Sequence, residues 1–122
     1  MLASAPRREP FASFLLAALR QLLGERLSTS AAVCAQHGKD ESYHRAHAPD
    51  AVAFPETTEE VAAIVKLCAA HRTPVIAFGT GTSLEGHVAA LAGGVSVDLT
   101  QMNRIVRVNV EDLDATDRKS VV

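Results

Sequence analysis

Apolar residues recur every three or four positions near the start of the chain, a period that predicts an amphipathic helix over residues 10–23. Gly24 follows, and glycine commonly ends a helix. A shorter helix is expected from Ser30, a suitable N-cap, to about Gln36. The first apolar run is far shorter than the roughly 18 residues of a membrane span, so a helix packed on the domain is preferred over a targeting segment. Its apolar face is formed by Phe11, Phe14, Leu15, Ala18, Leu19 and Leu22.

A strand, a helix and a second strand follow in the middle of the chain, in the order of a βαβ unit. The first strand is expected over Ala51–Phe54 and the helix over about 57–72, where Thr57 and Glu60 have the spacing of a capping box. Val75–Phe78 is apolar without interruption, which is typical of a strand in a sheet covered on both faces. The two strands are therefore expected to be parallel and joined by a right-handed crossover.

The remaining segments carry weaker patterns. Val95–Leu99 is expected to be a strand, and Ile105–Val110 alternates apolar and polar residues as a half-exposed strand does. The segment 37–44 is polar without either period and is expected to be a loop. The tail Glu111–Val122 is charged and has no period before its last two residues, so it is assigned no element.

Charge and aromatic content argue against a nucleic-acid partner. The formal net charge is −2, which gives no general attraction to nucleic acid or to an anionic membrane. The chain has no Trp and a single Tyr, so a surface for stacking bases is not expected. Cys34 and Cys68 lie far apart without a CxxC pattern, and we interpret them as two partly buried, reduced thiols.

A glycine-rich turn, Gly79–Gly86, follows the apolar strand and is the best candidate for a binding site. Its glycines can adopt positive φ and lie close to a ligand, and successive backbone N–H groups suit a phosphate anion. The turn fits neither common nucleotide loop: Leu84 stands where a GxGxxG pattern needs glycine, and His87 stands where a P-loop needs lysine. On spacing alone, a purely structural turn remains the alternative. The hydroxyl donors of the turn are Thr80, Thr82 and Ser83.

Other polar residues give weaker signals. His87 directly follows the turn and could face a ligand. His44 and His47 are three residues apart, but no third ligand is placed near them, so no metal site is predicted. Asp40 and Glu41 could form an acid/base pair, but nothing places them in a cleft, and a solvated loop is the expected setting. No catalytic residue is predicted.

Four motifs in order carry a resemblance to a known family, covering about two-thirds of the chain: HGKDESYH (37–44), PDAVAFPETTEEV (49–61), PVIAFGTGTSLEGHV (74–88) and GGVSVDLTQMNRI (93–105). The run resembles the start of the FAD-binding domain of the vanillyl-alcohol-oxidase/PCMH superfamily, closest to its D-lactate dehydrogenase (cytochrome) and glycolate oxidase flavoprotein group. The resemblance implies an α/β fold: the first lobe of a PCMH-type domain, with a short mainly parallel sheet, a βαβ unit and N-terminal helices. It divides the chain into a helical extension, a partial FAD-binding domain and a tail outside the family pattern, at 1–36, 37–116 and 117–122.

The resemblance also implies a cofactor, FAD, with its pyrophosphate wrapped by the glycine turn and flanked by the start of the strand before it and by the Asp98 region. It implies FAD binding in a flavin-dependent D-2-hydroxy-acid dehydrogenase of D-lactate or glycolate type, with the hydroxy acid bound only in the full-length protein. The alternative is a non-catalytic nucleotide- or partner-binding module. The candidate cofactor-binding residues are Pro74, Ile76, Gly79, Thr80, Gly81, Thr82, Ser83, Leu84, Gly86, His87 and Asp98.

The sequence departs from the family pattern after Thr116, so we expect a truncated chain that holds FAD weakly and is inactive alone. No transmembrane segment is expected. The expected compartment is the cytoplasm, with the membrane periphery as a further setting for the full-length protein.

Overall fold

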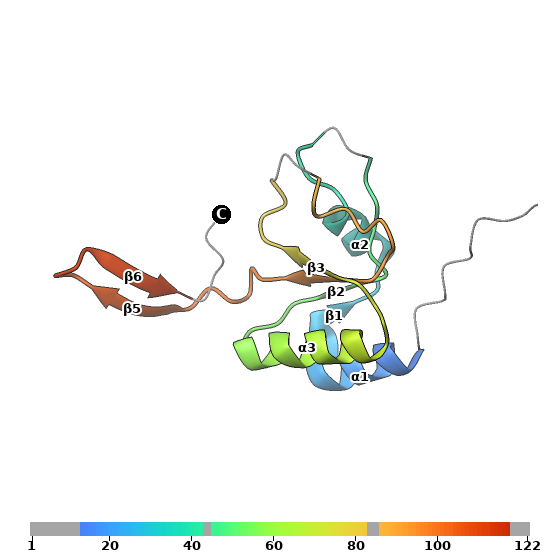
Figure 1. Ribbon diagram of the computed structural model, residues 1–122, viewed down its shortest axis with the longest axis horizontal. Helices are drawn as coiled ribbons and strands as arrows, with labels where there is room; N and C mark the ends of the chain where they lie inside the picture. Colours follow the sequence, from blue (N-terminus) through green and yellow to red (C-terminus); the bar gives the residue numbers. More distant parts are fainter. Residues whose placement is uncertain (1–12, 43–44, 83–85, 118–122) are drawn as a thin grey trace, which may run out of the picture.

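A computed structural model describes residues 13–42, 45–82 and 86–117. In Figure 1, helices α1 and α3 lie side by side along one face of a small sheet, α2 lies on the opposite side, and a β-hairpin projects from the body. The helical elements are α1 (Ser13–Leu23), the 3₁₀ turn η1 (Gly24–Arg26), α2 (Ala31–His37) and α3 (Thr58–Ala70). The strands are β1 (Leu27–Ser28), β2 (Ala51–Ala53), β3 (Val75–Phe78), β4 (Val95–Asp98), β5 (Ile105–Asn109) and β6 (Asp114–Asp117).

The main sheet has the strand order β1-β2-β4-β3. β2 and β3 are both parallel to β4, which confirms the parallel βαβ unit, and β4 lies between its two strands. β3 is consequently an edge strand, and Val75 is 39% exposed. The prediction that β3 is covered on both faces is wrong; β4, which is buried throughout, occupies that position.

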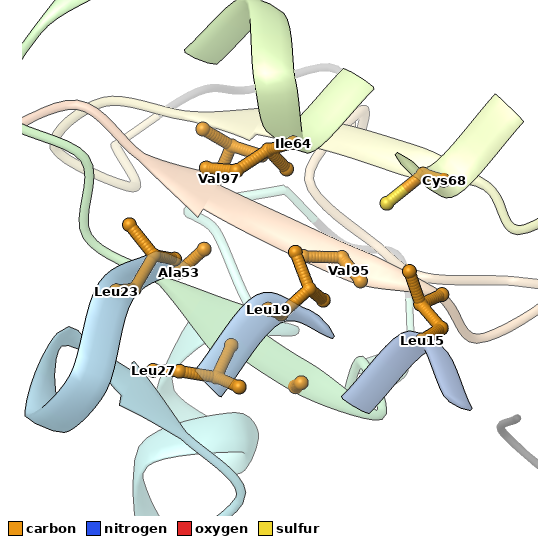
Figure 2. Close-up of a cluster of buried hydrophobic side chains, with 10 residues drawn as sticks. Leu15, Leu19, Leu23, Leu27, Ala53, Ile64, Cys68, Val95 and Val97 are labelled. Carbon is orange, nitrogen blue, oxygen red and sulfur yellow. The ribbon is translucent and has the colours of Figure 1, made fainter. Parts of the chain in front are cut away.

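The hydrophobic core lies between the sheet and the α1/α3 layer. Figure 2 shows Leu15 and Leu19 of α1 directed toward Val95 of β4, with Ile64 of α3 beside Val97. Because side chains alternate across a strand, Val95 and Val97 face this core, and the other two residues of β4 face α2. The first helix therefore shares its core with β2 and β4, while the domain division at residue 36 stays a prediction.

The apolar face predicted for the first helix differs from the buried face of α1. Phe14, assigned to its apolar face, is 80% exposed, because the buried stripe runs through the three leucines of α1 that follow at helical spacing. Phe11 lies outside the described residues.

The β5–β6 hairpin is only half anticipated by the sequence. β5 was expected, but both of its faces are exposed: Ile105 by 66% and Val106 by 50%. β6 falls in the tail to which no element was assigned, so that assignment is wrong. Its sequence, Asp-Ala-Thr-Asp, has little intrinsic strand propensity, and the strand forms by antiparallel pairing with β5.

A bidentate ion pair joins the start of α3 to the turn after α1. Thr57 caps α3 by accepting a hydrogen bond from the Glu60 amide at 3.1 Å, which confirms the predicted cap. The Glu60 carboxylate accepts from the Glu56 amide at 2.8 Å and from both terminal nitrogens of Arg26, at 2.7 and 2.5 Å. The hydrogen bonds from Arg26 are the main reason that the pKa of Glu60 falls to about 2.

Glu60→Gln tests this ion pair. The substitution keeps the size of the side chain and removes its charge, so we expect the free energy of unfolding at pH 7 to fall by about 1–2 kcal/mol. The folded pKa lies below the ordinary value of 4.5, so the stabilisation is complete above that pH and is lost as the pH falls toward about 2. Urea unfolding near pH 7 and pH 3 measures both effects, with Glu59→Gln, an exposed neighbour on α3, as the control. Equal stability of wild type and Glu60→Gln at pH 7 would contradict the assignment.

Candidate functional site

The glycine turn begins where β3 ends, at the carboxyl end of a parallel strand. Gly81 has φ of 75° and Gly86 has φ of 77°, a left-handed backbone that favours glycine. The hydroxyls of Thr80 and Thr82 are both exposed and lie 3.0 Å apart. Ser83 and Leu84, which also belong to the predicted site, lie outside the described residues. The described part of the turn therefore presents paired hydroxyls and a glycine backbone at the surface.

Gly81 is required for space as well as for its backbone angle. A Cβ atom at this position would lie 2.6 Å from the Cζ atom of Phe78, the last residue of β3. Phe78 is 8% exposed, so its ring fills the volume directly beneath the turn. The turn rests on this aromatic ring rather than only on its own backbone.

Phe78 in turn packs against a buried imidazole. The ring centroids of Phe78 and His37 are 4.4 Å apart, and His37 Nε2 lies 2.7 Å from Asp98 Oδ2. His37 Nδ1 lies 2.8 Å from the Val33 carbonyl oxygen, so both ring nitrogens face acceptors and both donate when the ring carries two protons. Asp98 Oδ1 accepts from the amide and hydroxyl of Thr100, at 2.8 and 2.6 Å. The end of α2 is thereby fixed to the end of β4.

A second buried carboxylate lies near the other end of the turn. Asp40 is 8% exposed, and its Oδ1 accepts from the amide and the hydroxyl of Ser42, at 2.9 and 2.5 Å. The Ser42 hydroxyl is the main cause of a lowered pKa for Asp40, to which the Gly86 amide and the charge of His87 also contribute. Among the described residues, Asp40 Oδ2 has no hydrogen-bond partner of normal geometry.

Backbone hydrogen bonds connect the segment after α2 with the segment after the turn. The His47 amide donates to Gly38 at 3.0 Å, and the Ala90 amide donates to His47 at 2.9 Å. A Cβ atom at Gly38 would collide with the His47 carbonyl oxygen. The polypeptide between α2 and β2 therefore lies against the polypeptide between the turn and β4.

The structure groups some of the predicted site residues and separates others. Gly79–Thr82 directly follow β3, whereas Gly86 and the exposed His87 come after residues 83–85, which lie outside the described residues. Asp98 is the register partner of Phe78, the last residue before the turn, and its carboxylate oxygens are directed to His37 and Thr100. Pro74 is at the opposite end of β3, where its carbonyl accepts from Val95 at 2.9 Å, and Ile76 is half-buried within β3.

The residues that support the turn were missed by the sequence analysis. The sequence predicts a loop over residues 37–44, with a solvated setting for Asp40 and Glu41. Instead, His37 is the last residue of α2 and 7% exposed, and Asp40 is also buried. The expectation of a solvated setting for Asp40 is therefore wrong. A signal for His37 existed, because it follows buried Cys34 at a spacing of three residues and continues the inner face of α2.

The cysteines play no part in this arrangement. Cys34 and Cys68 are both free and both buried, more fully than the partly buried setting that the sequence predicts. Burial raises the pKa of Cys68 to about 11, so its thiol stays protonated at neutral pH and is a poor nucleophile. Within the described ranges, no three His, Cys, Asp or Glu side chains are grouped as metal ligands.

The donors present at the turn suit a diphosphate. Gly81 has a left-handed backbone, and the hydroxyls of the neighbouring Thr80 and Thr82 are accessible at the surface. Neutral amides and hydroxyls in a left-handed turn bind phosphate oxygens without a lysine. The FAD pyrophosphate, which the sequence motifs imply, therefore fits the residues of the described part of the glycine turn.

Comparison with known proteins defines the class of protein to which this chain belongs. A family profile described as "FAD binding domain" matches residues 49–118, more than half of the chain, so the chain belongs to this family of FAD-binding domains. The structure of p-cresol methylhydroxylase with bound substrate superposes with a TM-score of 0.70 and 29% identity, over 80% of this chain and 20% of that protein. The fold is thus that of the PCMH-type FAD-binding domains, as the motifs implied, and FAD is its cofactor.

Two curated relatives are similar in sequence to most of this chain. A Danio rerio protein named "Probable D-lactate dehydrogenase, mitochondrial" is 48% identical over 103 residues, covering 84% of this chain and 21% of the relative. The mitochondrial D-lactate dehydrogenase (cytochrome) of Arabidopsis thaliana is 39% identical over 102 residues, covering 82% of this chain and 18% of the relative. The chain thus spans about a fifth of the length of these relatives. In the part of the chain that the structure describes, no helix is both long enough and apolar enough to cross a membrane.

Gly81→Ala tests the packing of the turn against Phe78. The new methyl group combines a left-handed backbone with a collision, so we expect a loss of about 2–4 kcal/mol in unfolding free energy. Gly24→Ala is the matched control: its φ is 60°, but a Cβ there meets no described atom within 4 Å. Gly24→Ala should therefore lose only the backbone part, about 1 kcal/mol. Equal melting temperatures for the two variants would contradict the packing of Gly81 on Phe78.

Proposed function

We propose that the glycine turn at the end of β3 holds the pyrophosphate of FAD, and that the bound flavin serves a D-2-hydroxy-acid dehydrogenase of D-lactate or glycolate type. The observation that carries the first part is the turn itself: Gly81 is left-handed, and two exposed hydroxyls lie beside it. The second part is supported by the names of the relatives, both D-lactate dehydrogenases. When bound, the flavin supplies a two-electron acceptor.

Each predicted site residue has a proposed role. The glycines, together with Ser83 and Leu84, offer backbone amides to the pyrophosphate, and Thr80 and Thr82 add hydroxyl donors. His87, exposed just after the turn, is proposed to contact a phosphate oxygen. Asp98 positions the site from below, while Pro74 and Ile76 belong to the strand that carries the turn.

Affinity of the chain for FAD should be modest. The described turn has no basic side chain among Gly79–Thr82, so binding depends on amides, hydroxyls and burial. Tight cofactor sites normally bury most of the ligand in a cleft. The described turn contributes one wall, and neighbouring β3 is exposed along its edge. We therefore expect a dissociation constant in the micromolar range or weaker.

Titration of the 122-residue chain with FAD, followed by flavin fluorescence, tests the binding proposal. ADP and NAD are the matched ligands, since both carry a diphosphate without a flavin. We expect saturable binding of FAD and little D-lactate-dependent dye reduction, because the described residues place no group against a hydroxy acid. Tighter binding of ADP or NAD than of FAD would favour the alternative, a non-catalytic nucleotide-binding module. Absence of saturable FAD binding up to millimolar concentration would overturn the proposal.

Substitutions in the turn locate the pyrophosphate. We expect Gly81→Val to raise the dissociation constant for FAD at least tenfold, because a branched side chain there is strained at positive φ and collides with the Phe78 ring, which displaces the turn. Thr80→Ala removes one hydrogen bond, worth about 0.5–1.5 kcal/mol, and should raise it about two- to tenfold. Gly24→Ala, distant from the turn in the sequence, serves as the control for backbone strain. If Gly81→Val binds FAD as wild type does, the pyrophosphate lies elsewhere.

The compartment and partners also remain proposals. The hydroxy acid is proposed as substrate of the full-length protein, and no nucleic-acid partner is proposed. The cytoplasm is the compartment predicted from the sequence, whereas both relatives are named as mitochondrial proteins. Fluorescence microscopy of the tagged protein distinguishes the two compartments.

A further inference from the structure

We propose that the short segment from His37 to Asp40, at the end of α2, is a positioning platform that holds both ends of the glycine turn in the geometry that binds FAD. The inference rests on the proposed function of the turn. It assigns a role to two buried, titratable side chains, His37 and Asp40, which are 7% and 8% exposed. Both act through other residues, so they are positioning residues rather than catalytic ones.

The first end of the turn is held through an unbroken series of contacts. Asp98 fixes the His37 ring at 2.7 Å, the ring packs on Phe78 with centroids 4.4 Å apart, and Phe78 occupies the space that a Gly81 side chain would need. Phe54 also contacts the imidazole in an edge-on geometry, with ring centroids 5.6 Å apart. The Phe78 ring is therefore confined between the imidazole and the turn, and the position of His37 determines where Gly81 lies.

The second end is held by Asp40 and by the backbone beside it. The Asp40 carboxylate is buried, and its Oδ1 accepts from the Ser42 amide and hydroxyl at 2.9 and 2.5 Å. The His47 amide donates to the Gly38 carbonyl at 3.0 Å, and the Ala90 amide donates to the His47 carbonyl at 2.9 Å, so the segment that carries Asp40 is joined to the residues just after the turn. The lowered pKa of Asp40, to which the Gly86 amide contributes after the Ser42 hydrogen bonds, agrees with this placement.

The two anchors, His37 and Asp40, lie only three residues apart in one short segment at the end of α2. Gly38, between them, has no room for a side chain against the His47 carbonyl oxygen, and its own carbonyl accepts from the His47 amide at 3.0 Å. A turn whose two ends are fixed to one rigid segment loses less conformational entropy when it orders around a ligand. The platform thus raises FAD affinity by pre-organisation, without touching the cofactor.

His37→Gln and Asp40→Asn test the platform. Gln keeps a donor for Asp98 but loses the ring against Phe78, and Asn keeps the size of Asp40 but loses its charge. We expect each to raise the dissociation constant for FAD about tenfold in the fluorescence titration. Ile64→Val, in the core on the other face of the sheet, is the control: it should lower the melting temperature of the FAD-free protein and leave the constant within twofold.

A double-mutant cycle separates positioning from general destabilisation. If His37 acts through Phe78, then Phe78→Leu alone raises the dissociation constant for FAD about tenfold. Adding His37→Gln to Phe78→Leu then changes that constant by less than a further twofold. The proposed action of His37 through Phe78 would be overturned if His37→Gln raised the dissociation constant for FAD tenfold both in the wild type and in Phe78→Leu. It would also be overturned if the variants lowered the melting temperature and left that constant unchanged. If His37→Gln does not fold, Phe78→Leu and Asp40→Asn still decide, since wild-type affinity in both overturns the platform. Failure of wild type to bind FAD, or wild-type affinity in Gly81→Val, instead points to failure of the proposed function.

Discussion

The packing of the Phe78 ring between Gly81 and His37 is the contact on which the candidate site depends. On one side the ring occupies the volume of the side chain that Gly81 lacks, and on the other it covers the buried imidazole. A surface turn is thereby given a fixed base that reaches into the domain. Because interiors are close-packed and change little in volume, displacement at one member of this stack is felt at the next.

β4 supports the stack of His37, Phe78 and Gly81 because its two faces contact different layers of the domain. Val95 and Val97 pack into the core with α1 and α3, as Figure 2 shows, while Asp98 faces α2 and binds His37. The same short strand therefore anchors the hydrophobic layer and the polar support of the turn. Parallel pairing with β2 and β3 on either side keeps β4 buried and sets the direction in which β3 delivers the turn.

The elements that could be predicted are those whose signals are local in the sequence. Thr57 caps α3 through a hydrogen bond to a residue three positions away, and the leucines of α1 repeat at helical spacing. The glycine turn was found for the same reason, since its glycines lie within eight residues of one another. β6 was missed because Asp-Ala-Thr-Asp has no strand propensity of its own and is extended only by pairing with β5.

The sequence by itself determined the helices, the parallel βαβ unit, the family motifs and the location of the turn, because period, capping and glycine content act over a few residues. Only the tertiary structure decided that β4 separates β2 from β3, and that His37 and Asp40 are buried. The physical reason is that His37 and Asp98 are 61 positions apart, and a polar residue becomes a buried one only when folding supplies its partner. Partners so distant in the chain leave no periodic signal in either segment alone.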